Sequence, residues 1–264
     1  MVRVLEIMRD RKLPILIRKA VSVCLLLLFT VAVNSQERRI ADMIELPAYS
    51  NVPGHQFVRH KTYTLSYDRK HRLPEWVAWM LEGSNLRLTT YKRSDRFTQD
   101  PQIDSKTSPT HDDYTNSGYD RGHMCPAGDN AWSKQAMEES FYTSNICPQK
   151  NILNNGTWKQ LEEKSRKWAH RYGRIYIVCG PVIPKSAKKQ IGKITIPYFF
   201  FKAILRIDKD GSYHMIGYLF SQENDFKPVT IDEIEAKTGL DLFHKLPKRI
   251  QQKLESRIDL SGWQ

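Results

Sequence analysis

The sequence predicts an α+β domain in which a central antiparallel sheet is flanked by helices. Two apolar runs, 196–208 and 213–221, are joined by the turn Lys209-Asp210-Gly211-Ser212, which is typical of a hairpin whose strands are covered on both faces. A second, alternating hairpin is predicted over 61–81. Between these two hairpins, 154–172 carries an apolar face at helical spacing. With 40% hydrophobic and 11% aromatic residues, the composition is that of a globular protein.

The first 35 residues are predicted to be a signal peptide. A basic stretch ends at Arg18-Lys19, and residues 20–33 are uncharged and mainly apolar. This run is shorter than the roughly 20 residues that a transmembrane helix needs. We place cleavage near Ser35 and expect an exported protein, periplasmic or secreted. Because the basic stretch is long, an uncleaved N-terminal membrane anchor stays as the alternative.

The charge indicates the class of partner. The formal net charge is +12, and residues 1–35 supply six basic and two acidic side chains, a net +4. The remaining chain therefore carries +8 (12 minus 4). A basic body favours polyanionic partners, although charge does not specify a fold.

The order of the elements follows from the pattern along the chain. Residues 36–56 are interpreted as an N-terminal leader that packs loosely, ahead of the domain. Lys61–Asp68 and Glu75–Leu81 are the predicted strands of the first hairpin, and its basic tip, 69–72, is either solvated or in contact with phosphate. The polar stretch 102–118 is a predicted loop, in which we take His111 to be solvated.

The second half of the chain adds helices and strands. Residues 131–141 have helical spacing, with Trp132, Met137 and Phe141 as core candidates. A strand from Arg174 is expected to end at the turn signal Gly180-Pro181. Thr230, with a glutamate three residues later, predicts a helix N-terminus. The chain then ends in a basic C-terminal tail, 251–264.

The segment 119–130 concentrates reactive side chains in the tetrapeptide D-R-G-H, 120–123. In a strand, Arg121 and His123 would share one face and Asp120 would take the other. Gly122 would allow a backbone or a phosphate to approach closely. An imidazole can take a proton from water, and a guanidinium can hold two phosphate oxygens. By itself the tetrapeptide is equally compatible with a strand-end turn carrying a surface salt bridge.

Two later motifs resolve this ambiguity. S-N-I-C-P-Q follows at 144–149, and L-N-N-G-T-W-K-Q-L-E follows at 153–162, with Arg166 one helical turn later. In this order and spacing, the three motifs resemble the DNA/RNA non-specific endonucleases of the ββα-metal (His-Me finger) type. The resemblance covers about 57–247 and implies a ββα-metal nuclease domain over 57–250.

The resemblance also implies roles for individual residues. His123 would be the general base and Asn154 the single protein ligand of a divalent ion, which we expect to be Mg²⁺ with Mn²⁺ as a substitute. Without the resemblance, Asn154 would be interpreted as a helix N-cap, and Glu162 with Arg166 as a helical ion pair. Eight helical positions span about 12 Å, so Glu162 is expected to orient a metal-bound water, and Arg166 to steady Glu162 or touch the phosphate.

Further residues complete the implied site. An arginine before Phe97 would contact the scissile phosphate together with Arg121; we favour Arg93, although the register leaves Arg96 open. Asp120 would fix the backbone and the charge balance. Asn145 and Gln149 would shape the loop around the metal.

Three cysteines remain after signal-peptide removal: Cys125, Cys147 and Cys179. No C-x-x-C spacing is present, which argues against a zinc site. If the two motifs line one site, Cys125 and Cys147 are close, and in an exported protein they are predicted to form a disulfide. The alternative is three small buried residues.

The sequence thus predicts an exported endonuclease that acts on DNA and RNA without sugar or sequence preference and needs no small organic cofactor. Two alternatives stay open: a non-catalytic cell-surface module that binds nucleic acid, and an exported phosphodiesterase acting on small nucleotides. The preference between DNA and RNA, the biological role and the oligomeric state, a homodimer included, are not decided by the sequence.

Overall fold

The computed structural model describes residues 43–48, 52–88, 90–184 and 186–263. Residues 44–264 form one compact unit. The predicted signal peptide, 1–35, lies outside the described residues. Within the described part of the chain, no helix has the length and apolar character required to cross a membrane.

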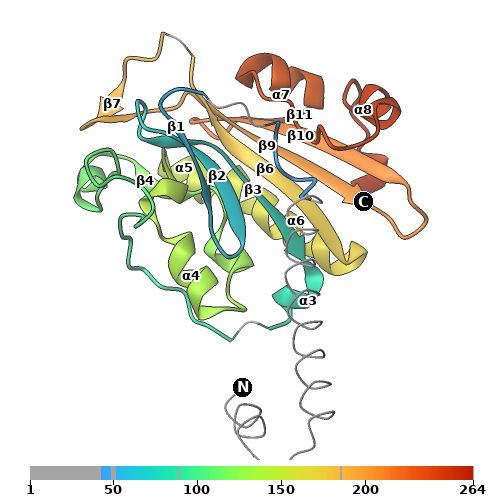
Figure 1. The fold of residues 1–264 in the computed structure, drawn as a ribbon, viewed down its shortest axis with the longest axis horizontal. Coiled ribbons are helices and arrows are strands. Elements are labelled where there is room, and N and C mark those ends of the chain that lie inside the picture. The colour runs from blue at the N-terminus through green and yellow to red at the C-terminus, as the bar shows by residue number, and fades with distance from the viewer. Residues whose placement is uncertain (1–42, 49–51, 89, 185, 264) are drawn as a thin grey trace, which may run out of the picture. The chain divides into compact units, whose positions relative to one another are not determined.

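A seven-stranded sheet forms the centre of this unit (Figure 1). Its order is β1-β2-β3-β6-β9-β10-β11, and every neighbouring pair is antiparallel. This confirms the predicted α+β class with a central antiparallel sheet. The strands are β1 (His55–Arg59), β2 (Tyr63–Asp68), β3 (Leu73–Glu82), β6 (Arg174–Val182), β9 (Phe199–Ile207), β10 (Tyr213–Ser221) and β11 (Phe226–Val229).

The sheet is covered on both faces, as the apolar runs predicted. On β9, Phe200 and Ile204 belong to one core cluster, whereas Phe201 and Leu205 belong to the other. Alternate side chains of a strand point to opposite faces, so each run fills two cores. Helix α6 (Thr157–Tyr172) packs in the first core, and α7 (Ile231–Thr238) and α8 (Lys248–Leu254) pack in the second.

One predicted strand end is wrong. Strand β6 continues through Gly180 and Pro181 and stays paired with β9 there. A Cβ on Gly180 would lie 2.4 Å from the carbonyl oxygen of Glu75, so the glycine permits a close strand contact and not a turn. Pairing with β3 ends at Cys179, and the missing N–H of Pro181 therefore leaves the β3 pairing intact.

A smaller unit is built on the first core. Strand β4 (Asp120–His123) pairs antiparallel with β5 (Ile146–Gln149), and α5 (Asn151–Asn154) and α6 follow directly. Asn154 ends α5 and is not the N-cap of a helix running to Tyr172. Gly156 precedes α6, and the side chain of Asn224 accepts the N–H of Thr157 at 2.8 Å. Capping is thus supplied from a distant turn, and Asn154 is free of that role.

The remaining elements surround these two units. Helix α4 (Lys134–Ser140) begins after Ser133, whose hydroxyl accepts the N–H of Ala136. Trp132 lies outside this helix and is half-buried, not in the core as expected. Thr230 caps α7 as predicted, because its side chain accepts the N–H of Glu233. The short elements are α3 (Gly83–Leu86), β7 (Gln190–Ile191), β8 (Ile194–Thr195) and the 3₁₀ turns η1 (Asp112–Tyr114), η2 (Ala127–Asp129), η3 (Thr143–Asn145) and η4 (Ser261–Trp263).

The two ends of the compact unit are packed against it. Ile44 and Leu46 contact the second core, and the N–H of Ala48 donates to the carbonyl oxygen of Asp241 at 2.8 Å. At the other end, Trp263 is buried against Trp168, with ring centroids 4.8 Å apart. Parts of the segments interpreted as a loose leader and a basic tail therefore contribute to the cores.

Candidate active site

His123 is buried at the end of β4, with 7% of its surface exposed. Its ring packs against Phe97 and Phe141, with centroid distances of 5.4 Å and 4.8 Å. Among the described residues, its buried Nε2 has no hydrogen-bond partner. Burial, reinforced by the charge of Arg93, lowers the pKa of His123 to about 3. The imidazole is therefore neutral at physiological pH and keeps a lone pair that can accept a proton.

Asp120 gathers asparagine side chains from the start of the helical segment. Its Oδ2 accepts hydrogen bonds from the Nδ2 atoms of Asn151 and Asn154 at 3.0 Å each, and of Asn155 at 3.5 Å. The sequence suggested a role for Asp120 in the backbone and charge balance, whereas its carboxylate contacts side chains. Because Asn154 donates through Nδ2, its Oδ1 remains available as an acceptor or ligand.

Arg166 binds the carboxylate of Asp129. Arg166 donates to Oδ1 of Asp129 at 3.0 Å, and the ion pairs of the described residues include none between Arg166 and Glu162. The helical ion pair, which was the interpretation without the resemblance, is therefore absent from this part of the chain, and a contact of Arg166 with phosphate stays a prediction. Asp129 also accepts the Nε1–H of Trp79 at 3.1 Å. Only one feature of the sequence indicated that Asp129 would bind Arg166 and Trp79, namely its position in the segment 119–130.

Glu162 is half-buried beside a set of positive charges. Burial raises its pKa to about 7, although the charges of Lys202, Arg166 and Arg93 oppose this shift. Lys202 was not predicted from the sequence. It is 1% exposed on β9, with Nζ 4.0 Å from the ring centroid of Trp158. The one sequence feature that could have identified Lys202 is its position as a lysine inside an apolar strand.

Arg121 lies beside the loop that precedes β4. Its Nη2 donates to the carbonyl oxygen of His111 at 2.8 Å and lies 3.2 Å from the Nε2 of the same residue. Its guanidinium carbon is 5.6 Å from the ring centroid of Phe97, which also packs on His123. His111 is exposed, as expected of a loop histidine, but it contacts Arg121 and so belongs to the site.

The two candidate arginines before Phe97 lie in different surroundings. The guanidinium carbon of Arg93 is 5.2 Å from the ring centroid of Phe141, the ring that packs on His123. Its charge also affects the pKa values of His123 and Glu162. Both arginines are exposed, and Nε of Arg93 donates to Oδ1 of Asp95 at 3.1 Å, but the cation–π contacts of the described residues include none for Arg96. The geometry therefore favours Arg93.

The side chain of Gln149 occupies the space that a side chain at position 122 would need. A Cβ on Gly122 would lie 2.0 Å from Oε1 of Gln149, so the glycine makes room for this side chain and not for another backbone. Gln149 is fully buried, and neither end of its amide has a partner among the described residues. Asn145, in contrast, is fully bonded: its side chain accepts the N–H of Cys125 and donates to the carbonyl oxygens of Cys125 and Ser140.

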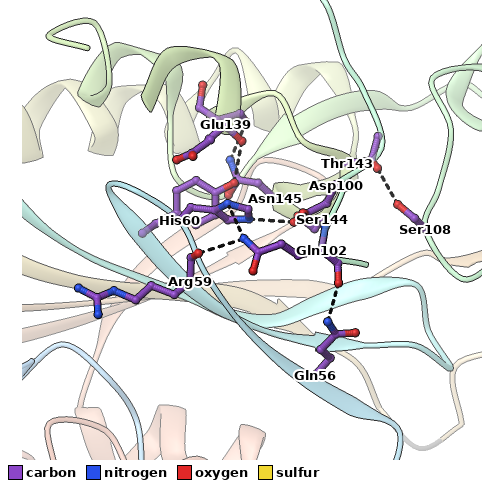
Figure 2. Close-up of polar contacts among 12 residues, drawn as sticks. Gln56, Arg59, His60, Asp100, Gln102, Ser108, Glu139, Thr143, Ser144 and Asn145 are labelled. Carbon is purple, nitrogen blue, oxygen red and sulfur yellow. Dashed lines mark hydrogen bonds and ion pairs between the residues drawn. The ribbon is translucent and has the colours of Figure 1, made fainter. Parts of the chain in front are cut away.

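A buried polar network supports the loop that carries Phe97 (Figure 2). His60 Nε2 lies 2.8 Å from Oδ2 of Asp100, and the hydroxyl of Ser144 donates to the same oxygen. Burial alone would raise the pKa of Asp100, but these hydrogen bonds hold it below its usual value. Serine and histidine both bind the carboxylate, and all three residues are buried, so the group is structural and not a nucleophilic triad.

The predicted disulfide is not formed in the structure. Cys125, Cys147 and Cys179 are all buried free cysteines. The side chain of Asn130 donates to the sulfur of Cys125, and the thiol of Cys179 donates to the carbonyl oxygen of Met124 at 3.4 Å. The alternative of small buried residues describes all three.

One side chain offers a free oxygen ligand for a hard divalent cation. Asn154 donates through Nδ2 to Asp120, which leaves its amide Oδ1 available. Oxygen ligands of this kind suit Mg²⁺, which retains several waters and takes few protein ligands.

Comparisons with known proteins show the family of this chain. Residues 47–249 match the family described as DNA/RNA non-specific endonuclease. Mitochondrial nuclease EXOG of Danio rerio is 33% identical over 210 residues, covering 72% of this chain and 61% of the relative. Mitochondrial endonuclease G of Homo sapiens is 32% identical over 215 residues, covering 74% of this chain and 72% of the relative. The chain spans about three fifths of the length of the EXOG relatives that it matches.

A solved nuclease structure also resembles this chain. The crystal structure of an EndoG/EndoGI complex matches with a TM-score of 0.69 and 28% identity, covering 80% of this chain and 94% of that chain. The family match, residues 47–249, lies within the compact unit that holds β4, β5 and α6. The chain has the ββα-metal nuclease fold and belongs to the DNA/RNA non-specific endonuclease family.

Proposed function

We propose that this protein is an exported, Mg²⁺-dependent endonuclease that hydrolyses phosphodiester bonds of DNA and RNA. The observation that carries the proposal is the buried imidazole of His123, whose surroundings keep it neutral and able to accept a proton. It stands in the same strand as Asp120, which holds the amide of Asn154. In this proposal, residues 120–123 supply the proton acceptor, His123, and hold the cation ligand, Asn154, through Asp120.

In the proposed mechanism, the neutral imidazole of His123 takes a proton from the attacking water. Its buried Nε2 is shielded from solvent, so Nδ1 is the ring nitrogen that accepts the proton. Arg93 and Arg121 hold phosphate oxygens through charge-assisted hydrogen bonds. Burial and Arg93 both destabilise the imidazolium, which favours release of the proton after each cycle and at the same time makes the imidazole a weaker base.

The divalent ion would be held by Asn154 and would supply charge stabilisation for the phosphate and the leaving oxygen. Asp120 orients this ligand, because it binds Nδ2 of Asn154 and leaves Oδ1 for the ion. Glu162 accepts a hydrogen bond from water and orients it.

The proposed substrate class follows from the same groups. The arginines recognise phosphate, and phosphate contacts carry no direct sequence information. The basic body of the chain, +8 outside residues 1–35 (12 minus 4), strengthens binding to any polyanionic strand. We therefore expect cleavage of DNA and RNA with little sequence preference.

Digestion of supercoiled plasmid and of RNA by the purified protein tests the proposal, with MgCl₂ in one arm and EDTA in the other. Cleavage of both polymers in MgCl₂ alone is the expected result. Binding without cleavage would favour a nucleic-acid-binding module. Turnover of a small chromogenic diester with an intact plasmid would favour a phosphodiesterase for small nucleotides.

Export is a separate part of the proposal and rests on the apolar run 20–33 after a basic stretch. The EXOG and endonuclease G relatives are named as mitochondrial, which makes a direct test necessary. Cell fractionation with N-terminal sequencing should find the protein outside the cytoplasm and beginning near Gln36. A full-length N-terminus in the membrane fraction would instead indicate an uncleaved anchor.

A further inference from the structure

A second group of carboxylates lies on the other face of the sheet, where α7 and α8 pack. Asp232 and Glu235 are on α7, and Glu255 directly follows α8. One carboxylate oxygen of each lies within 4.8 Å of the other two. We call these three residues the α7–α8 acidic cluster. The N–H of Asp232 also donates to the carbonyl oxygen of Glu255 at 3.1 Å, so the two segments meet at this cluster.

Glu255 lacks the partner that a buried carboxylate requires. It is 9% exposed, and its Oε1 has no hydrogen bond among the described residues. Burial, followed by the negative charges of Glu235 and Asp232, raises the pKa of Glu255 to about 7. An unpaired buried carboxylate is costly unless a cation or a proton neutralises it.

The charged groups nearby do not supply this neutralisation. Asp241 adds a further negative charge, and Lys248 is the positive charge that acts on Glu255. Across the described ranges, the ion pairs include none between Lys248 and the cluster. Glu235 is partly satisfied, because its Oε1 accepts the N–H of Leu242 at 2.6 Å.

We propose that the α7–α8 acidic cluster is a calcium site, separate from the active site, that fastens the end of α8 to α7. Ca²⁺ takes six to eight oxygen ligands in flexible geometry and accepts carboxylates in one- or two-oxygen contacts. The exposed Asp232 provides an entry path and room for waters, while Glu255 contributes an oxygen from the interior. Mg²⁺ demands stricter octahedral geometry and suits this site less.

The test uses the full chain with the Asn154→Ala substitution, which removes the proposed ion ligand of the active site. Melting temperature is measured in EDTA, in CaCl₂ and in MgCl₂. Calcium at about 100 times its Kd should raise the melting temperature by roughly 5–10 °C. Calorimetric titration with CaCl₂ should show one site. No calcium shift, or an equal shift in MgCl₂, overturns the proposal.

Substitutions added to the Asn154→Ala protein test whether calcium binds at the α7–α8 acidic cluster. Glu255→Gln and Asp232→Asn should each abolish the calcium shift. Glu233→Gln is the matched control, because Glu233 lies on the same helix but pairs with Lys227 outside the cluster; it should retain the shift. If Glu255→Gln does not fold, the exposed Asp232→Asn still decides. A calcium shift that survives Asp232→Asn, or that persists in a folded Glu255→Gln protein, contradicts the proposal.

Discussion

Glu162 and Glu255 lie on opposite faces of the central sheet and have the same raised pKa, about 7, with burial as the largest cause. Their neighbours differ. The positive charges of Lys202, Arg166 and Arg93 oppose the pKa shift of Glu162, and Asp129 adds to it. At Glu255 the negative charges of Glu235, Asp232 and Asp241 add to the shift, and Lys248 opposes it.

The comparison shows that a perturbed carboxylate does not by itself identify the catalytic site. Near Glu162, the two arginines and Lys202 suit an anionic phosphate. Near Glu255, converging carboxylates suit a cation or a proton. Four substitutions, in order of decreasing effect, test this division.

His123→Ala should lower cleavage by about 10²–10⁴-fold, because it removes the proposed general base. Plasmid cleavage rates in MgCl₂ measure the loss. Glu255→Gln should leave cleavage near the wild-type rate, and His111→Ala, which changes an exposed histidine of the same site, should have a far smaller effect. Near-wild-type turnover of His123→Ala would remove this residue from the mechanism.

Asn154→Ala should lower cleavage by more than the roughly 10–100-fold expected for a residue beside a metal ligand, with partial recovery at high MgCl₂. Because Asn154 does not cap α6, the melting temperature should change little. Asn151→Ala is the matched control, since Asn151 also donates to Asp120. A magnesium titration decides; equal losses in the two variants would contradict a ligand role for Asn154.

Glu162→Gln should lower cleavage by roughly 10–100-fold and yet stabilise the fold at high pH. The folded pKa of about 7 exceeds the ordinary value of 4.5, so the wild type loses stability as pH rises from 4.5 through 7. In EDTA, Glu162→Gln should therefore melt above the wild type at pH 8 and equal it below pH 4.5. In EDTA at pH 8, Glu255→Gln should likewise melt above the wild type. In CaCl₂ it should no longer do so, because calcium stabilises only the wild type, and this difference distinguishes Glu255 from Glu162.

Arg93→Ala should have the smallest effect, a weaker affinity for all duplexes alike. Binding on a His123→Ala background should show a slope of log K against log salt that is flatter by about one unit. Arg96→Ala is the matched control and should leave the slope unchanged. A salt-insensitive affinity, or a strong preference between two unrelated duplexes, would contradict non-specific phosphate recognition.

Local patterns along the chain were enough to predict several elements and the family. The alternating residues of 61–68 and the turn after Asp208 predicted strands that the structure contains, because side-chain alternation and turn chemistry act over a few residues. The Thr230 cap was predicted for the same reason. Three spaced motifs were sufficient to predict the family and its fold.

The partners of the reactive side chains depend instead on tertiary packing. Arg166 binds Asp129 and not Glu162, and Asp120 binds Asn154 across 34 positions of the chain. Strand β6 continues through Gly180 because β9 pairs with it there. Nothing in the sequence distinguishes Glu255 from an exposed glutamate, yet it is buried in the fold. Such contacts join residues far apart in the chain, and the direction of each side chain is fixed by the packing of whole elements, which local patterns do not encode.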